Sequence, residues 1–332
     1  EICEGTFSRA ERDGEELTCL HLDDGAVIRA DLYVDASGFA SELLAKTLGE
    51  PFVSFANTLL CDRAVIAGWR RTQEPIKPYT TAETMSAGWC WQIDHEHFIN
   101  RGYVYSSAFV TDDAALAEFR AKNRQLQTEP RIVHFKTGRY QRGWVGNVVA
   151  AGNASGFVEP LEATAIQVIT SQARTLSDLL IDSRRVVTPS VRALYNRHLG
   201  GHWDEIRDFL GVHYRFNHRV KSDFWAACHA HADVGEAAEL VEYFRENGPS
   251  ILATGTLVRA ASPFGLEGYL ALLVGQGVPQ HRPWNAPMAE RRTWQQHLAD
   301  CGRRANLAIS VEQALRIVRE QIAASQKVGG SS

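Results

Sequence analysis

Residues 148–165 read VVAAGNASGFVEPLEATA, a strand of small residues that passes through a glycine turn and an irregular loop into a helix. Gly152 lets the backbone come close to a flat ligand. Pro160 suits the first turn of a helix, because the N–H that proline lacks has no partner there. We therefore expect the helix to begin after Pro160 and to carry Glu162 in its first turn, where free N–H groups favour an anionic ligand.

The same segment also has a purely structural interpretation. Acids are common in the first turn of a helix, where they interact with unpaired N–H groups. Taken alone, Glu162 is explained about twice as well by such a cap as by a reaction site.

A second glycine turn lies upstream, where residues 31–41 read DLYVDASGFAS. A strand ending in Asp-Ala-Ser-Gly is common in nucleotide-binding sheets, whose ligands lie at the carboxyl ends of the strands. Asp35 and Ser37 therefore either contact a nucleotide or cap a short helix predicted from SELLAKTL, residues 41–48. The sequence favours neither interpretation.

Two tryptophans stand at positions i and i+2 of SAGWCWQID, residues 86–94. In a strand, Trp89 and Trp91 point to the same face. Such a pair can line an aromatic pocket, but packing into the core is the more common role.

The whole chain is rich in strands first and in helices last, which predicts a mixed α/β fold with a helical C-terminal region. Residues 5–35 are expected to form a β-meander with strands at 17–22 and 26–34. Further strands are expected at 89–94, at 102–110 and within 131–152, and helices at 113–123, 165–182, 190–210, 218–246 and 311–325.

The composition argues against several classes of protein. Of 332 residues, 45% are hydrophobic and 22% are charged, which is typical of soluble globular proteins. The formal net charge of −4 argues against a nucleic-acid partner, and no apolar run reaches the roughly 18 residues that a membrane span needs. Six scattered cysteines without a CxxC pair favour reduced thiols and a cytoplasmic location. The chain starts without methionine or leader, so we expect it to begin within a longer protein.

Several motifs in this order resemble the flavin-dependent halogenases, and in particular the tryptophan halogenase-like members of that family. They are DLYVDASGF, PYTTAETMSAGWCWQI, GYVYSSAF and GNASGFVEPLEATA, followed by GHWDEIRDFL and HYRFNHRVKSDFWAAC from the helical region. Trp-x-Trp-x-Ile is the most distinctive of them, and the resemblance covers residues 5–285. It implies a partial, flavin monooxygenase-like FAD-binding fold with a mixed β-sheet substrate domain and a helical C-terminal region.

The resemblance also implies an activity. In the family, FADH2 and oxygen form a flavin hydroperoxide that oxidises chloride or bromide to hypohalous acid, which halogenates an electron-rich aromatic compound. The expected substrate is of indole, phenol or pyrrole type, free or carrier-bound, and a separate flavin reductase supplies FADH2. A homodimer is compatible with this picture. The alternatives are a flavin-dependent aromatic hydroxylase without halide chemistry and an inactive fragment.

Carried over residue by residue, the resemblance makes Glu162 the catalytic acid or base, polarising the activated halogen or accepting the ring proton. Trp89 and Trp91 line the substrate pocket, and Thr164 and Ala165 present N–H groups to the halide. The full set expected to bind the cofactor is Asp35, Ser37, Gly38, Gly152, Asn153, Thr164, Ala165 and Ile166.

The chain departs from the family pattern in three ways. The Gly-x-Gly-x-x-Gly fingerprint and the catalytic lysine of the family are absent from it, and both are expected upstream. Asp94 stands where the family has proline, which adds a charge and frees an N–H. Glu-Ala-Thr-Ala at 162–165 replaces Glu-Ser-Thr-Gly, which removes a hydroxyl near the halide.

A metal site is not expected. His95 and His97 flank Glu96 in sequence that should continue as a strand, so both imidazoles would face one side. No third or fourth ligand is placed by the spacing, and the chance of zinc binding is about one in ten.

The expected organisation has four parts. Residues 1–60 and 140–185 form the partial FAD-binding domain, and residues 61–139 form the β-sheet region on the substrate side. Residues 186–326 form the helical C-terminal region and residues 327–332 a flexible tail.

Overall fold

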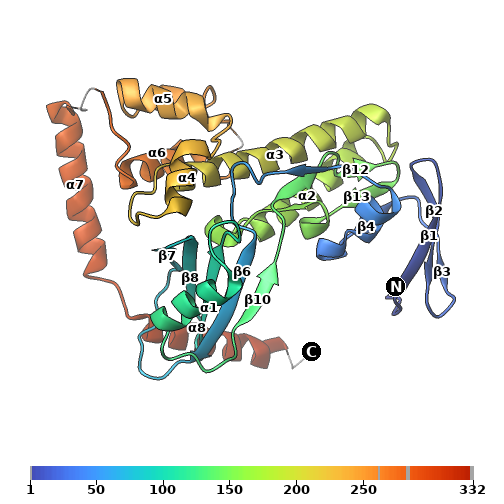
Figure 1. The fold of residues 1–332 in the computed structure, drawn as a ribbon, viewed down its shortest axis with the longest axis horizontal. Coiled ribbons are helices and arrows are strands. Elements are labelled where there is room, and N and C mark those ends of the chain that lie inside the picture. Colours follow the sequence, from blue (N-terminus) through green and yellow to red (C-terminus); the bar gives the residue numbers. More distant parts are fainter. Residues whose placement is uncertain (1, 261, 282–284, 330–332) are drawn as a thin grey trace.

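The computed structural model describes residues 2–260, 262–281 and 285–329, and shows a mixed α/β fold (Figure 1). A long helix, α3 (Pro189–Arg215), runs across the molecule. Small sheets built from both early and middle segments of the chain lie near one end of α3, and the C-terminal helices α4 to α6 gather at the other end. The main hydrophobic core includes Trp89, Trp144 and Trp203.

The largest sheet is five-stranded and antiparallel, in the order β10-β6-β9-β8-β7. Trp89 and Trp91 pack into the main core, while Cys90 joins the cluster on the opposite face, as the strand alternation predicted. Helix α1 (Asp112–Lys122) covers that second face and begins one residue before the predicted start, with the side chain of Thr111 as its cap. The strands are β6 (Arg63–Arg70), β7 (Thr81–Met85), β8 (Gly88–Asp94), β9 (Phe98–Tyr105) and β10 (Arg131–His134).

Three small sheets bring early and middle parts of the chain together. One contains β1 (Phe7–Asp13), β2 (Glu16–Leu22) and β3 (Val27–Ile28). A second contains β12 (Trp144–Val145), β13 (Val148–Ala150) and β4 (Tyr33–Asp35), with β13 and β4 parallel. The third contains β14 (Gly156–Phe157), β11 (Gly138–Tyr140) and β5 (Phe52–Ser54).

The predicted return strand at 26–34 is wrong, because it is two strands in different sheets. β3 completes the β1–β2 hairpin, whereas β4 pairs with β13. The separation follows from Tyr33, which is buried against Leu17 and Val148 and whose N–H donates to the carbonyl of Asn147.

The helical region contains α2 (Ala165–Asp182), which matches its predicted bounds, and α3, which extends five residues beyond them. The predicted stretch 218–246 is two helices, because Gly235 adopts a φ of 50° between them. Helix α8 continues to Gly329, so residues 327–329 are helical rather than part of a tail, and residues 330–332 lie outside the described residues. The other helices are α4 (Asp223–His231), α5 (Ala237–Asn247), α6 (Gly265–Gly275) and α7 (Met288–Ala305), and the sequence did not predict the last two.

Candidate active site

The segment between β13 and α2 forms two short turns rather than one continuous helix start. Pro160–Glu162 form a 3-10 helix that ends at Ala163, whose φ of 52° is left-handed. This conformation costs a non-glycine residue about 1–2 kcal/mol and interrupts the helix. Pro160 and Glu162 do lie in the first turn of a helix, as predicted, but this helix is the short 3-10 helix and is not continuous with α2, which begins at Ala165.

A cavity of about 470 Å³ opens beside this segment. Its walls come from β7, β8, Leu161 of the 3-10 helix, the end of α3, and helices α4 and α6. Such a volume is within the range of small-molecule sites. The aromatic residues of the wall are Trp89, Tyr214, Phe216 and Trp225.

Glu159 lies behind the aromatic wall and is 1% exposed. Because the next residue is a proline, its backbone is confined to an extended conformation, with φ −60° and ψ 156°. Its Oε1 accepts hydrogen bonds from the indole Nε1 of Trp89 at 3.0 Å and from the hydroxyl of Tyr214 at 2.5 Å. Its Oε2 is buried and has no hydrogen-bond partner among the described residues.

Burial is the main reason why the pKa of Glu159 is raised from 4.5 to about 7, since the charged form loses its hydration. The hydrogen bonds from Tyr214 and Trp89 act in the opposite direction and lower the pKa. The sequence analysis did not single out this residue. The signal available was an acid placed between Val158 and Pro160 in an otherwise apolar segment.

Glu162 lies at the rim of the cavity, because its neighbour Leu161 and its contact His213 line the cavity while 32% of its own side chain is exposed. Its Oε1 is 2.7 Å from Nε2 of His213, which lines the cavity. The two atoms are at ion-pair distance but do not have the alignment of a hydrogen bond. The predicted catalytic carboxylate is thus beside the cavity, and a histidine that the sequence analysis did not name contacts it.

The structure places the two tryptophans differently. Trp89 lines the cavity. Trp91 lies flat against its cross-strand partner Gly102, where any Cβ would come within about 2.1 Å of the indole ring. Trp91 is not among the residues that line the cavity.

The predicted cofactor residues gather where the parallel strands β4 and β13 end. Gly38 follows β4 with a φ of 67° and open space where a Cβ would lie, and Gly152 follows β13 with a φ of 58°. The carboxyl ends of parallel strands are where α/β sheets bind nucleotides. Phe39, which is 60% exposed, adds an apolar surface at this edge. The shape and chemistry of the edge therefore suit a flat cofactor.

Asp35 and Ser37 have structural roles at the same edge. The carboxylate of Asp35 accepts hydrogen bonds from the hydroxyl of Ser37 at 2.6 Å and from the backbone N–H groups of Leu43 and Leu44. It therefore holds the short π-helix at residues 42–47, in the position predicted for a short helix. Of the two interpretations left open, this geometry favours the cap.

The start of α2 contains the remaining predicted residues. Thr164 is buried and its hydroxyl does not cap the helix, whereas Ala165 and Ile166 are exposed, Ile166 to 78%. Asn153 is half-buried in the preceding loop. Gln172 of α2 fixes that loop, because its Oε1 accepts from the N–H of Gly152 at 2.8 Å.

Asp94 has a structural explanation for its departure from the family proline. Its buried carboxylate accepts hydrogen bonds from the backbone N–H of Lys77 and the side chain of Gln92. Arg71 lies 3.7 Å away, and its guanidinium also binds the carbonyl oxygen of His95. Asp94 thus ties the segment before β7 to the end of β8.

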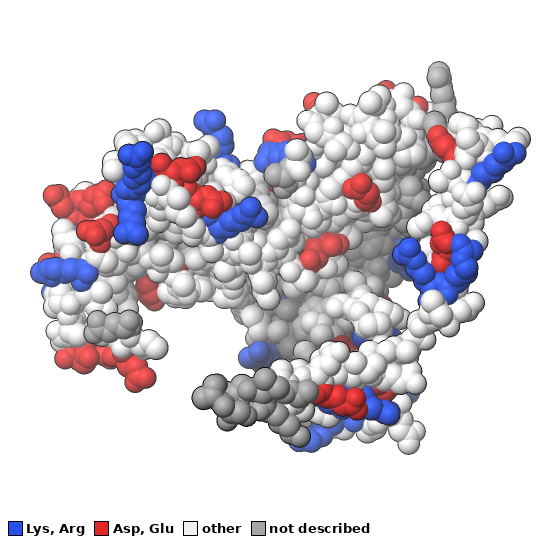
Figure 2. Space-filling model, turned by 180° about the vertical axis from the view of Figure 1, so that it is seen from behind, with Lys and Arg blue, Asp and Glu red and all other residues white. Residues whose placement is uncertain are grey.

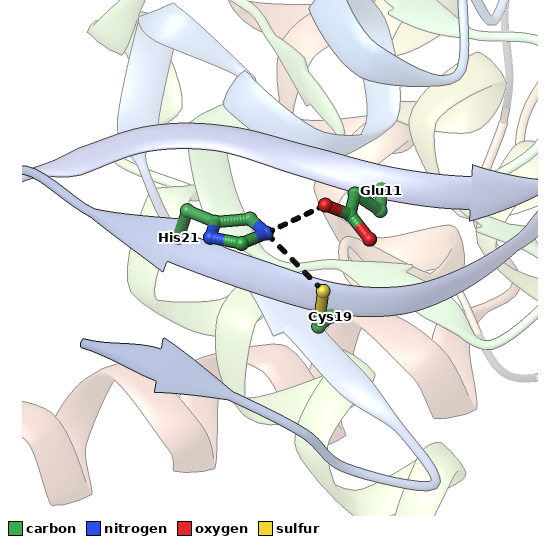
Figure 3. A group of neighbouring side chains, drawn as sticks. All are labelled: Glu11, Cys19 and His21. Atoms are coloured by element: carbon green, nitrogen blue, oxygen red, sulfur yellow. Dashed lines mark hydrogen bonds and ion pairs between the residues drawn. The ribbon is translucent and has the colours of Figure 1, made fainter. Parts of the chain in front are cut away.

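The expected strand through His95 and His97 is wrong, because residues 95–97 form the turn between β8 and β9. A different cluster brings together metal-ligating atoms within 4.8 Å, namely Glu11 of β1 with Cys19 and His21 of β2 (Figure 3). His21 Nε2 is 2.9 Å from the carboxylate of Glu11 and 3.4 Å from the thiol of Cys19. Arg9 already binds the same Glu11 oxygen at 2.9 Å, so hydrogen bonds and an ion pair account for the cluster.

The surface carries both charges. Basic and acidic side chains are interspersed on the face in Figure 2. All six cysteines are free thiols. Among the described residues, no helix combines the length and the apolar character needed to cross a bilayer.

The parallel strand pair with its glycine turns and the sheet that carries the aromatic cavity form a fold shared with solved flavin-dependent halogenases. The profile of the tryptophan halogenase family matches residues 2–290. Tryptophan 7-halogenase KtzQ of Kutzneria sp. (strain 744) is 35% identical over 251 residues, covering 73% of this chain and 46% of that protein. Tryptophan 7-halogenase RebH of Lentzea aerocolonigenes is 38% identical over 212 residues, covering 61% and 39%.

Solved structures agree. BrvH, a flavin-dependent halogenase from Brevundimonas sp. BAL3, superposes with a TM-score of 0.85 at 28% identity, covering 94% of this chain and 64% of that one. The chain belongs to the tryptophan halogenase family. It spans less than half the length of these curated relatives.

Proposed function

We propose that the protein halogenates an electron-rich aromatic compound of indole, phenol or pyrrole type, using FADH2 and oxygen. The observation that carries this proposal is one cavity with Trp89 in its wall and the Glu162–His213 pair at its rim. The family match supports it, since the relatives named above are halogenases.

The residues at the ends of β4 and β13 would hold the flavin. Gly38 and Gly152 would let its rings approach the backbone, and the start of α2 at Thr164 and Ala165 would offer N–H groups to an anion such as chloride or bromide. When bound, the flavin supplies the oxidation of halide by oxygen. Asp35 and Ser37 would support this edge indirectly, by holding the turn in place.

Glu162 would act on the substrate. Replacing an aromatic C–H by a C–halogen bond releases a proton, and a carboxylate at the cavity rim would accept it or polarise the halogenating agent. His213 would hold that carboxylate toward the cavity. Trp89 and Tyr214 would pack against the flat face of the substrate.

The test uses the full-length protein with a flavin reductase, NADH, FAD, oxygen and either bromide or chloride. A panel of indoles, phenols and pyrroles, free and carrier-bound, is screened by mass spectrometry. We expect a halogenated product from at least one of them. No halogenated product across the panel would overturn the proposal.

A flavin-dependent aromatic hydroxylase is the second candidate. It is motivated by Asp94 and Ala163, which depart from the family pattern, Asp94 at the end of β8 and Ala163 next to the proposed halide position. An oxygenated product formed equally well without halide would favour it over halogenation.

The proposal extends to organisation and partners. Residues 1–60 and 140–185 would belong to the FAD-binding part, 61–139 to the substrate-side sheet and 186–326 to the helical part. A separate cytoplasmic flavin reductase would supply FADH2.

A further inference from the structure

An acid that the proposed chemistry does not use lies behind the cavity wall. Glu159 is buried behind Trp89 and Tyr214 and binds both with a single oxygen. The two donors come from β8 and α3, so this carboxyl joins the sheet to the long helix at the cavity. Trp225 completes the wall by stacking on Tyr214, with ring centroids 5.7 Å apart.

We infer that Glu159 is a positioning residue for the aromatic wall, and that uptake or release of a proton by this carboxyl changes how firmly Trp89 is held and hence how tightly the cavity binds an aromatic ligand.

The geometry makes the ionised form the stronger anchor. Hydrogen bonds to a charged acceptor are roughly twice as strong as those to a neutral one. Because both donors converge on Oε1, a proton added to Glu159 goes to Oε2, where no acceptor lies among the described residues. Protonation therefore keeps the arrangement but weakens both hydrogen bonds.

The titratable groups that face Glu159 from neighbouring elements stay neutral near pH 7. Tyr214 of α3 and Cys61, which precedes β6, have pKa values well above their usual ranges, because both are fully buried. Burial also raises the pKa of Cys228 of α4 to about 12. His213, next to Tyr214, contacts Glu162 instead. Among these groups, Glu159 alone has its pKa moved to about 7.

The first experiment follows the hydrogen bond between Trp89 and Glu159 and does not require enzyme activity. The full-length protein is labelled with ¹⁵N at its indole groups, and the N–H signals are followed from pH 5.5 to 8.5. Trp89 is identified by its loss in W89F and Trp225 by its loss in W225F. We expect the Trp89 signal to move in a single transition near pH 7, and that of Trp225, which donates to the carbonyl of Met85, to move much less.

Two variants assign the transition. E159Q keeps an acceptor oxygen but cannot ionise, so the Trp89 transition should disappear. The matched control E162Q makes the same change three residues away and should leave the transition in place. A Trp89 signal that does not titrate, or that titrates equally in E159Q, would overturn the inference.

A third variant tests the inference even if E159Q does not fold. Y214F removes one of the two donors to Oε1 and leaves Trp89 in place. Because that hydrogen bond lowers the pKa of Glu159, its loss should move the Trp89 transition to higher pH. An unchanged midpoint in Y214F counts against the inference.

The second experiment concerns binding and rests on the proposed function, because it assumes that the cavity takes an aromatic compound. Indole affinity is measured calorimetrically at pH 5.5 and 8.5. We expect several-fold tighter binding at the higher pH in the wild type and a pH-independent, weaker affinity in E159Q. A purely structural role would lower affinity equally at both pH values. Failure of indole to bind, with the Trp89 transition present, would count against the proposed substrate class and not against the anchor.

Discussion

Two glutamates three residues apart on the same segment have opposite surroundings. Glu159 is buried, accepts two hydrogen bonds and has a pKa raised to about 7. Glu162 is partly exposed at the cavity rim, with its Oε1 2.7 Å from Nε2 of His213. Glu159 stands directly before Pro160 in an extended conformation and is buried, whereas Glu162 lies inside the 3-10 helix that follows and is partly exposed. The comparison teaches that two acids of one short motif have opposite environments, which is why we propose an anchoring role for the first and a reacting role for the second.

The largest expected effect is on the halogenation rate and comes from Glu162 at the cavity rim. Glu162→Gln removes the carboxylate proposed to accept a proton or polarise the halogenating agent, and should lower the halogenation rate by about 10² to 10⁴-fold. Product formation with saturating FADH2 and bromide measures it. Asp178→Asn, an exposed acid on α2, serves as the control and should keep the wild-type rate. A Glu162→Gln rate within about twofold of wild type would remove Glu162 from the proposed chemistry.

The buried acid should instead appear in the pH dependence of stability. Folded Glu159 keeps its proton up to about pH 7, whereas the same group in the unfolded chain loses it near pH 4.5. Between these values the native state binds more protons, so the free energy of unfolding falls as the pH rises, by about 3 kcal/mol in total. The fall ends above pH 7.

Urea denaturation of the wild type and Glu159→Gln from pH 4 to 8 isolates this contribution, since other groups cancel in the difference. The wild type should lose stability relative to the variant as the pH rises. Parallel stability curves would show that Glu159 titrates as an ordinary exposed acid. The two glutamates would then not differ in their protonation near neutral pH.

The sequence predicted the helix and the strand that flank this site better than the residues between them. Apolar periodicity placed α2 at its observed bounds, and strand alternation placed Trp89 and Trp91 on one face. The break at Ala163 was not predictable, because alanine disfavours left-handed backbone and only the surrounding structure holds it there. Glu159 was missed for a different reason. Its donors lie 70 and 55 residues away along the chain, and no local pattern connects them.

The loop that precedes both glutamates in the chain gives the next prediction. Gln172 is 3% exposed, and it accepts from Gly152 N–H and donates to the hydroxyl of Ser155 at 2.7 Å. Gln172→Ala leaves that buried N–H without its partner and should lower the free energy of unfolding by about 1–3 kcal/mol. Gln167→Ala, an exposed position on the same helix, should change it by less than about 0.5 kcal/mol. Equal effects in urea denaturation would show that the loop is held by other contacts.

The smallest expected effect concerns His213, the only side chain that we assign to orient Glu162. The pair is partly exposed, and such pairs contribute about 0.2–1 kcal/mol. His213→Phe keeps an aromatic ring against Phe209 and removes the interaction with the carboxylate, so kcat/KM should fall by at most about fivefold while stability stays within about 1 kcal/mol. His231→Phe, at the exposed end of α4, is the control and should leave both unchanged. A loss as large as that of Glu162→Gln would mean that His213 itself takes part in proton transfer, and the rim would then contain a reacting pair rather than a single carboxylate.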